Sequence, residues 1–329
     1  MDKGRTATQI PAMSPFVVLN DADVNALARM PDLVPVVERC LQAKAHGRLI
    51  APPRHSVAFD AGQLVFTIGG IAAGEEGADG IAGFRVYETF PGAGTARAQI
   101  VAVWDSGSGN LLGLVVGDSL GVLRTGAIGG VAIDRMARPD ARTCGIIGSG
   151  AQAESQLLAA VAVRPGLLTI RIYSRNARNR ESFAERMSAR VGKTIQPVGA
   201  AHDAVAGADL VLCATDSGSP VIEMQWLARG THVSTLGPKL VQCHELPRDI
   251  GDVADVAATD SPTQLNAYPA PHFLAGTPAG DGMLDLSDIV AGRASGRRSP
   301  TDITLFCSVG LAGTEVAVAN ALLRQTPPS

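Results

Sequence analysis

A glycine-rich turn near the middle of the chain has residue types and spacing that suit phosphate binding. It reads Gly148-Ser149-Gly150-Ala151-Gln152-Ala153, follows an apolar run and precedes a stretch of helical composition. Gly148 permits a tight turn, Gly150 lets a phosphate approach the backbone, and Ala153 permits close packing of a helix on a strand. A strand, turn and helix in this order present backbone N–H groups to a dinucleotide pyrophosphate. The turn therefore predicts a dinucleotide-binding site.

The residues after the next expected strand indicate which nicotinamide cofactor this site prefers. A site for NAD usually has Asp or Glu there, about 20 residues past the glycines, to bind the ribose 2′-hydroxyl. Here the sequence Ser174-Arg175-Asn176-Ala177-Arg178 contains no acid. A hydroxyl, an amide and two arginines suit a 2′-phosphate, which needs charge-assisted donors. We therefore expect NADP(H), with NAD(H) as the alternative cofactor; the two arginines could instead only solvate a loop.

The elements that must position the turn alternate between strands and helices. A helix is expected from Arg124 to about Ala137, directly before the strand of the glycine turn. The further strands are expected at Leu168–Tyr173, Thr194–Pro197, Leu210–Ala214, His232–Leu236, Val253–Ala257 and Thr304–Val309. Such alternation implies a doubly wound, Rossmann-type parallel sheet of the α/β class, with a final helix from Leu311 to Leu323.

The N-terminal third has a different pattern. A short helix is expected after Asn20, to about Met30, and a second helix opens at Pro31-Asp32 and ends at Gly47. From Pro52 to Gly117 apolar residues recur with period two between turn signals, as in the hairpin around Asp60-Ala61-Gly62. This pattern predicts an antiparallel meander, and so an α+β domain in front of the parallel sheet.

Composition limits the remaining classes of function. The chain has 329 residues, of which 46% are hydrophobic and 18% charged, so we expect about two globular domains. A net charge of −3 gives no reason to expect nucleic acid or an anionic membrane as a partner. We expect no membrane span, no signal peptide in Met1 to Pro15 and a cytoplasmic location, since the five cysteines are scattered. The pair Cys243-His244 is too small a ligand set for a metal, so no metal is expected.

A second motif lies upstream of the glycine turn. Arg124-Thr125-Gly126-Ala127 opens the expected helix, about twenty residues before Gly148. Together with Gly-Ser-Gly-Ala-Gln, this arrangement resembles the ornithine cyclodeaminase/mu-crystallin family, and the resemblance extends from about Leu19 to Leu323. It implies a homodimer built through the N-terminal domain. The expected division is residues 1–122, joined by 310–329, for substrate binding and dimerisation, and 123–309 for NAD(P) binding.

The resemblance also assigns site residues. It implies that Arg54, Arg85 and Arg124 bind a small amino or imino carboxylate, and that Arg124 also faces the nicotinamide. The expected cofactor-binding residues, from the two arguments together, are Gln99, Arg124, Gly148, Gly150, Ala151, Gln152, Ser174, Arg175, Asn176, Arg178, Ala214, Thr215, Leu236, Gly237 and Ser308.

This sequence departs from the family pattern at two expected catalytic positions. Arg85 stands where the family usually has lysine, and Lys239 stands where cyclodeaminases have aspartate. Arginine binds and polarises but hardly gives up a proton, so Arg85 is a poor base. A buried Lys239 near other cations would have a lowered pKa and could shuttle the proton of an imine nitrogen. The alternative is that Lys239 is an exposed loop residue.

Three functions are consistent with these residues. Three arginines near one pocket repel each other unless an anion joins them, and a 2-imino or 2-amino carboxylate supplies that anion. The first hypothesis is an NAD(P)H-dependent reductase of small cyclic imino acids (a ketimine reductase) or the reverse amino-acid dehydrogenase. The second is ornithine cyclodeaminase, which the missing aspartate disfavours. The third is a non-catalytic protein that binds NADPH and a carboxylate ligand, as mu-crystallin does.

Overall fold

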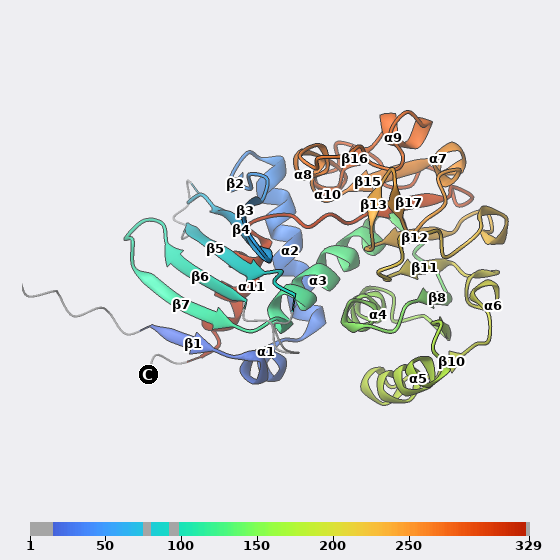
Figure 1. Cartoon of the computed structure of the whole chain (residues 1–329), viewed down its shortest axis with the longest axis horizontal. Coiled ribbons are helices and arrows are strands. Elements are labelled where there is room, and N and C mark those ends of the chain that lie inside the picture. Colours follow the sequence, from blue (N-terminus) through green and yellow to red (C-terminus); the bar gives the residue numbers. More distant parts are fainter. Residues whose placement is uncertain (1–15, 75–79, 92–98, 327–329) are drawn as a thin grey trace, which may run out of the picture.

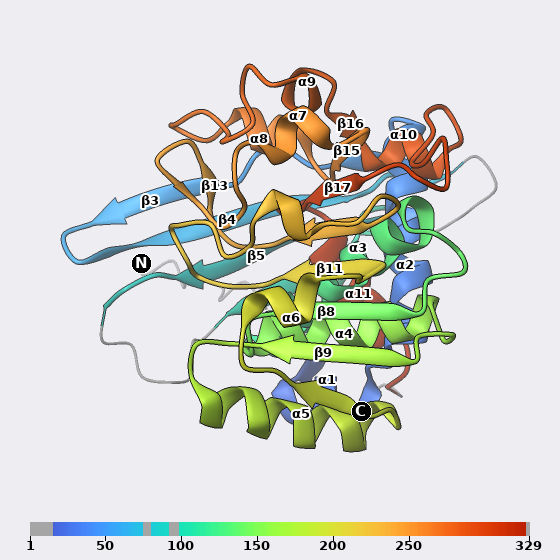
Figure 2. The same ribbon diagram turned by 90° about the vertical axis from the view of Figure 1, so that its right-hand side faces the viewer.

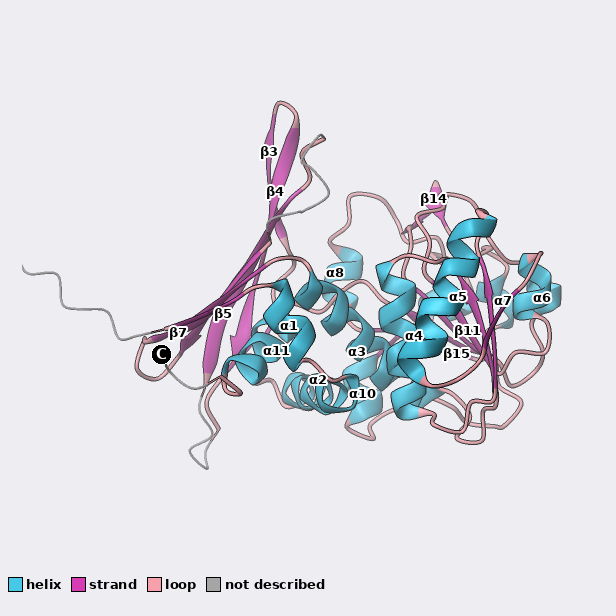
Figure 3. Ribbon diagram, turned by 90° about the horizontal axis from the view of Figure 1, so that it is seen from below, coloured by secondary structure: helices cyan, strands magenta, loops and turns pink. Residues whose placement is uncertain are grey.

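The computed structural model describes residues 16–74, 80–91 and 99–326, and the segment Met1 to Pro15 lies outside them. Two β-sheets stand apart from each other with a layer of helices between them (Figure 1; Figure 3). The expected α/β class, with a parallel sheet and an N-terminal α+β part, is confirmed. Within the described ranges, no helix is both long enough and apolar enough to cross a membrane.

The first sheet has seven strands in the order β1-β7-β6-β5-β4-β2, with β3 paired to β4. Its strands are β1 (Val17–Leu19), β2 (Leu49–Ile50), β3 (His55–Phe59), β4 (Gly62–Ile71), β5 (Ile81–Glu88), β6 (Ile100–Asp105) and β7 (Leu111–Val116). The strands from β2 to β7 pair antiparallel as expected. The edge strand β1 was not expected, and it pairs parallel with β7. The sheet is therefore mixed, because a segment before the helices returns to its edge.

Helices cover one face of this sheet. They are α1 (Asp21–Leu27), α2 (Met30–Ala45), α3 (Ser119–Met136) and α11 (Thr314–Leu323). A capping box at Asn20 starts α1, and Gly47 ends the second helix with a φ of +70°. Helix α3 begins five residues before the expected start at Arg124, so that arginine lies inside the helix. Helix α11 comes from the far end of the sequence and packs against the first sheet.

The second sheet has eight strands, all parallel, in the order β10-β9-β8-β11-β12-β17-β15-β16. They are β8 (Thr143–Ile147), β9 (Thr169–Tyr173), β10 (Ile195–Pro197), β11 (Leu210–Cys213), β12 (His232–Thr235), β15 (Val256–Thr259), β16 (Leu284–Asp285) and β17 (Thr304–Cys307). The expected strand Val253–Ala257 is wrong in its bounds, because Ile250–Val253 forms helix α7. A short apolar run does not distinguish helix from strand.

Helices cover both faces of the parallel sheet. On one face α3, α4 (Ala151–Val163) and α5 (Ala177–Val191) share a core with the strands. On the other face α6 (Ala201–Val205), α7 and α9 (Pro278–Asp281) share a second core. The remaining elements are the 3-10 helix η1 (Met224–Trp226), β13 (Lys239–Leu240), β14 (Cys243–His244), α8 (Pro262–Asn266) and α10 (Leu286–Val290).

The order of the parallel strands reverses between β8 and β11. The chain moves outward from β8 to β9 and β10 and then returns to the other side of β8, where β11 begins the second half. Figure 2 looks onto this region, with β11, β8 and β9 next to one another. In open parallel sheets a crevice forms outside the carboxyl ends of the strands at such a reversal, and ligands bind there.

Candidate active site

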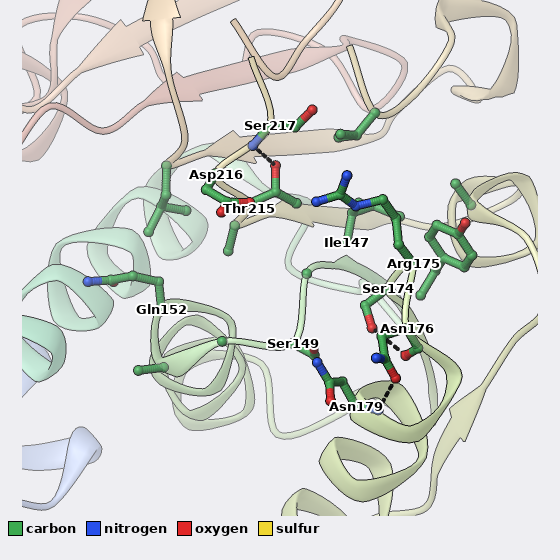
Figure 4. A pocket seen from close by; sticks show the side chains of 18 of the residues that line it. Ile147, Ser149, Gln152, Ser174, Arg175, Asn176, Asn179, Thr215, Asp216 and Ser217 are labelled. Carbon is green, nitrogen blue, oxygen red and sulfur yellow. Dashed lines mark hydrogen bonds between the residues drawn. The ribbon is translucent and has the colours of Figure 1, made fainter. Parts of the chain in front are cut away.

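A cavity of about 840 Å³ lies at this reversal, at the carboxyl ends of β8, β9 and β11 (Figure 4). Its lining includes many residues expected to bind the cofactor: Gly148, Gly150, Ala151, Gln152, Ser174, Arg175, Asn176, Ala214, Thr215 and Leu236. It also includes Asn179, Asp216 and Ser217, which sequence reasoning did not single out. The structure therefore brings the glycine turn, the end of β9 and the end of β11 around one space.

The glycine turn has the backbone geometry that a phosphate needs. Gly148 has a φ of +110°, and a Cβ there would lie 2.3 Å from the carbonyl oxygen of Ala214. Gly150 is the N-cap of α4, and a Cβ built on it would meet no atom within 4 Å. No side chain caps this helix, and Oε1 of Gln152 is buried without a hydrogen-bond partner in the described part of the chain. A helix N-terminus open to a cavity in this way fits a pyrophosphate.

The end of β9 supplies polar side chains to the cavity, next to the glycine turn. Figure 4 shows Arg175 extending into the cavity toward the side on which Thr215 lies, with Ser174 and Asn176 beside it. The side chain of Asn176 accepts a hydrogen bond from the Asn179 backbone (3.2 Å) and caps α5. The Ser174 hydroxyl donates to the Asn176 carbonyl (3.1 Å), so the charged donor that this end of the cavity offers a phosphate is the guanidinium of Arg175.

Arg178 differs from its neighbours at the end of β9. It lies in the first turn of α5 and is not among the residues that line the cavity. The structure therefore brings only one of the two expected arginines, Arg175, to the space around the glycine turn.

Glu245 holds the ends of β11 and β12 in place and was not recognised as a site residue. Its buried carboxylate accepts hydrogen bonds from the backbone and hydroxyl of Thr215 (3.0 and 2.8 Å). It also accepts from the Thr235 hydroxyl (2.6 Å) and from the backbones of Leu236 (2.9 Å) and Gly237 (2.6 Å). One carboxylate thus fixes both segments expected beside the nicotinamide. Nothing in the local sequence signals this, because the five donors lie 8 to 30 positions away.

The three arginines named from the sequence converge between the two sheets. A Cβ on Gly310 would lie 3.0 Å from Nη2 of Arg54 and 3.2 Å from Nη1 of Arg124. Arg124 and Arg85 both reach Oε1 of Glu315, at 3.1 and 3.6 Å. Glu315 is 1% exposed and comes from α11. A single acid in an otherwise apolar buried helix is a sequence signal that could have identified it.

Arg85 is held on all sides. Its Nε (2.9 Å) and Nη2 donate to Oε1 of Gln99, its Nη1 faces Glu315, and its guanidinium lies 4.4 Å from the centre of the Tyr87 ring. Burial and the neighbouring Arg124 charge lower the pKa of Arg85 to about 10. Gln99, expected to contact the cofactor, is placed beside Arg85 and does not line the cavity.

Lys239 is buried, so the alternative of an exposed loop lysine is wrong. Its side chain is 7% exposed, and its Nζ donates to the carbonyl oxygen of Gly237 (2.6 Å). Burial lowers the pKa of Lys239; Glu245 and other nearby acids oppose this, and the Arg54 charge adds to it. Lys239 therefore lies within reach of the Arg54 charge and beside the segment that Glu245 fixes.

The turn after β17 connects these groups. Ser308, expected to bind the cofactor, is buried there, and its backbone donates to the Thr235 carbonyl (3.1 Å). The carboxylate of Asp260 accepts from the backbones of Val309 and Gly310 (2.8 Å each), and Val309 in turn accepts from Arg54. The position of Arg54 thus depends on the end of the parallel sheet.

Two of the arginines have buried donors that nothing in the described ranges satisfies. These are Nε of Arg54 and Nε and Nη1 of Arg124. Buried polar groups are usually hydrogen-bonded, so unpartnered guanidinium donors indicate a place for an anion. In Arg85, by contrast, Nε and Nη2 are hydrogen-bonded and Nη1 faces a carboxylate.

Comparisons with known proteins identify the family to which the sequence and fold belong. The model of the ornithine cyclodeaminase/mu-crystallin family matches residues 15–325. A Δ1-pyrroline-2-carboxylate reductase of Bacillus cereus (strain ZK / E33L) is 29% identical over 320 residues, which cover 93% of this chain and 95% of that protein. An alanine dehydrogenase of Archaeoglobus fulgidus is 26% identical over 316 residues, covering 93% and 94%.

A solved structure with a similar fold is that of Thermococcus litoralis Δ1-pyrroline-2-carboxylate reductase in complex with NADH and L-proline. It matches with a TM-score of 0.83 and 27% identity, over 94% of this chain and 97% of that chain. The family match spans both sheets and every residue of the candidate site. The chain belongs to the ornithine cyclodeaminase/mu-crystallin family.

Proposed function

We propose that the chain is an NAD(P)H-dependent reductase of small cyclic imino acids, or a dehydrogenase running the reverse reaction on the amino acid. The observation that carries the proposal is the set of buried donors on Arg54 and Arg124 that no group in the described residues satisfies, together with the buried amine of Lys239, which lies within reach of the Arg54 charge. Such donors suit the carboxylate of an imino acid, and such an amine suits proton transfer at its nitrogen. The similar proteins of B. cereus and T. litoralis are both named Δ1-pyrroline-2-carboxylate reductase, and this supports the proposed activity.

In the proposed mechanism, the chain positions the substrate and handles one proton. A reduced nicotinamide, when bound, would supply hydride to the imine carbon. Arg54 and Arg124 hold the carboxylate, which orients that carbon, and this is chiefly a positioning contribution. Lys239 donates a proton to the imine nitrogen, so the C=N bond becomes CH–NH. Its lowered pKa makes the Lys239 ammonium a stronger acid than an ordinary lysine, and the neutral amine accepts the proton in the reverse direction.

Arg85 has a supporting part in this proposal. The guanidinium of Arg85 is already engaged by Gln99, Glu315 and Tyr87. We therefore assign Arg85 to holding the three arginines in place and to polarising the bound substrate, not to proton transfer. This assignment agrees with the expectation that arginine is a poor base.

The proposed cofactor is NADP(H) in preference to NAD(H). Arg175, Ser174 and Asn176 line the cavity where an acid would be needed for the ribose 2′-hydroxyl of NAD. The phosphate-binding part is the turn at Gly148 and Gly150, with Thr215 and Leu236 on the nicotinamide side.

The proposed assembly is a homodimer through the outer face of the first sheet. Paired residues across five strands, Ile68, Phe84, Ala102, Leu114 and Val18, point to one side of the sheet. Ile68 and Val18 are each 54% exposed, and Ile100 on the same face is 37% exposed. Ala102 at the centre of this row is buried, but the exposed apolar side chains on either side of it support an interface.

We further propose the division expected from the sequence, with residues 1–122 and 310–329 forming the substrate and dimerisation domain and 123–309 the cofactor domain. Part of these ranges lies outside the described residues. Packing of α11 on the first sheet supports the return of the C-terminal segment to the first domain. A cytoplasmic location is proposed because all five cysteines are free thiols, four of them buried.

The experiment that tests the proposed function is an NADPH oxidation assay with Δ1-pyrroline-2-carboxylate and Δ1-piperideine-2-carboxylate, run beside ornithine with NAD. Oxidation with either imine is the expected result. Proline formed from ornithine, without imine reduction, would instead favour a cyclodeaminase in which Lys239 replaces the family aspartate. Tight NADPH binding with no turnover of any imine would favour a binding protein.

A further inference from the structure

The proposed reductase mechanism gives the buried carboxylate of Glu315 no part in carboxylate binding or proton transfer, although it lies against two of the three arginines. Its Oε1 lies 3.1 Å from Nη2 of Arg124 and 3.6 Å from Nη1 of Arg85. The hydroxyl of Thr67 donates to the same oxygen (3.4 Å). The arginine cluster therefore contains an internal carboxylate before any ligand enters. This differs from the sequence-based expectation that only a ligand could join the three cations.

We propose that Glu315 is an internal counter-anion that limits how tightly the arginine cluster holds a carboxylate, and so allows the product to leave. This inference rests on the proposed function, because it concerns the same carboxylate subsite.

The charge count of the cluster supports the inference. Three guanidinium groups and one carboxylate leave an excess of two positive charges, and a monocarboxylate ligand would leave one. Without Glu315 the same ligand would face three uncompensated cations. In a buried site such charges interact much more strongly than in water. An enzyme that binds its product too tightly turns over slowly, so a resident negative charge near the carboxylate subsite favours release.

The geometry also allows the charge of Glu315 to be separated from its shape. In Glu315→Gln, the amide oxygen can still accept from Arg124 and Thr67. The new NH₂ group would face the hydroxyl of Thr314, 3.5 Å from the present Oε2. That hydroxyl donates to the carbonyl of Leu311 (2.6 Å), so its oxygen is free to accept. The substitution therefore removes the charge and keeps the hydrogen bonds.

The test compares wild type, Glu315→Gln and Glu315→Asp, each saturated with NADPH. Calorimetry measures the Kd of pyrrole-2-carboxylate, a planar carboxylate that cannot be reduced as an imine, and turnover assays give KM and kcat with Δ1-pyrroline-2-carboxylate. For Glu315→Gln we expect Kd and KM to fall about tenfold and kcat to fall with them, as release slows. Glu315→Asp keeps the charge but withdraws it from Arg124, so an intermediate fall in Kd is expected.

If Glu315 only held Arg124 in position, its replacement would raise the Kd of the carboxylate instead of lowering it. An unchanged or raised Kd in Glu315→Gln overturns the inference, and so does a wild type that binds no carboxylate. If Glu315→Gln does not fold, the direction of the Kd change in Glu315→Asp decides. The calorimetric readout does not require turnover, so a wild type that binds the carboxylate but reduces no imine contradicts the proposed function and leaves the Glu315 comparison valid.

Discussion

Replacing Arg175 by alanine should weaken binding of NADPH but not of NADH. Arg175 lines the cavity at the end of β9, where the ribose phosphate of NADPH is expected. It makes no hydrogen bond or ion pair within the described part of the chain, so its loss should leave the fold unchanged. The perturbation therefore acts on the cofactor alone, which makes the comparison of two cofactors informative.

The size of the effect follows from the exposure of the side chain. A hydrogen bond between charged groups contributes about 1.5–3 kcal/mol, and solvent screening at an exposed residue such as Arg175 favours the lower end. A loss of about 1.4 kcal/mol is a tenfold change in affinity. We therefore expect the KM for NADPH to rise about tenfold in Arg175→Ala, and the KM for NADH to change less than about twofold.

Arg178→Ala is the matched control, because Arg178 follows the same strand but does not line the cavity. The assay is steady-state reduction of Δ1-pyrroline-2-carboxylate with each cofactor in turn, and the wild-type preference for NADPH should weaken at high salt. Equal losses for NADPH and NADH in Arg175→Ala would refute the assignment of this residue to the 2′-phosphate. An effect of Arg178→Ala as large as that of Arg175→Ala would refute the cavity as the basis of the preference.

Three further predictions test the site and the fold. In Lys239→Met we expect kcat to fall at least about a hundredfold, because the ammonium of Lys239 is the proposed proton donor. For the same reason the kcat of the wild type should decrease as pH rises through the lowered pKa of Lys239. A flat pH–rate profile would contradict this role. Gly150→Ala should keep the wild-type Tm, because its Cβ meets no atom of the described residues within 4 Å, yet raise the Kd of NADPH about tenfold or more by excluding a phosphate. Unchanged binding in a fluorescence titration would count against the glycine turn as the phosphate site. Burial, and after it the charge of Arg297, lower the pKa of His232 to about 3, so below pH 6.5 the imidazole takes up a proton in the unfolded chain but not in the folded chain. Urea unfolding should therefore show that this group makes the protein about 2 kcal/mol less stable at pH 5 than at pH 7. His232→Gln should remove that difference.

Those parts of the site that depend on local backbone conformation could be predicted from the sequence. The turn at Gly148 and Gly150 is specified by its own residues, since a positive φ and an uncapped helix start follow from glycine. The polar residues at the end of β9 could also be recognised from neighbouring sequence alone. Only the structure showed that Arg175 lines the cavity and Arg178 does not. The alternation of strands and helices likewise fixed the parallel sheet, because each element has its own hydrophobic period.

Errors in the fold arose where a local pattern was ambiguous. The apolar run at Val253 could begin a strand or end a helix, and packing of α7 decided for the helix. The pairing of β1 with β7 depends on contacts between residues nearly a hundred positions apart, for which no local signal exists.

The sequence by itself determined which residue types were available for the site: three arginines, a lysine in an unusual position and a glycine turn. The tertiary structure decided their state. It buried Lys239, satisfied Arg85 with Gln99 and Glu315, and left donors of Arg54 and Arg124 without partners among the described residues. The physical reason is that desolvation and hydrogen-bond partners come from elements distant in the chain. The charge of a side chain is set by its type, but its pKa and its free donors are set by what packs around it.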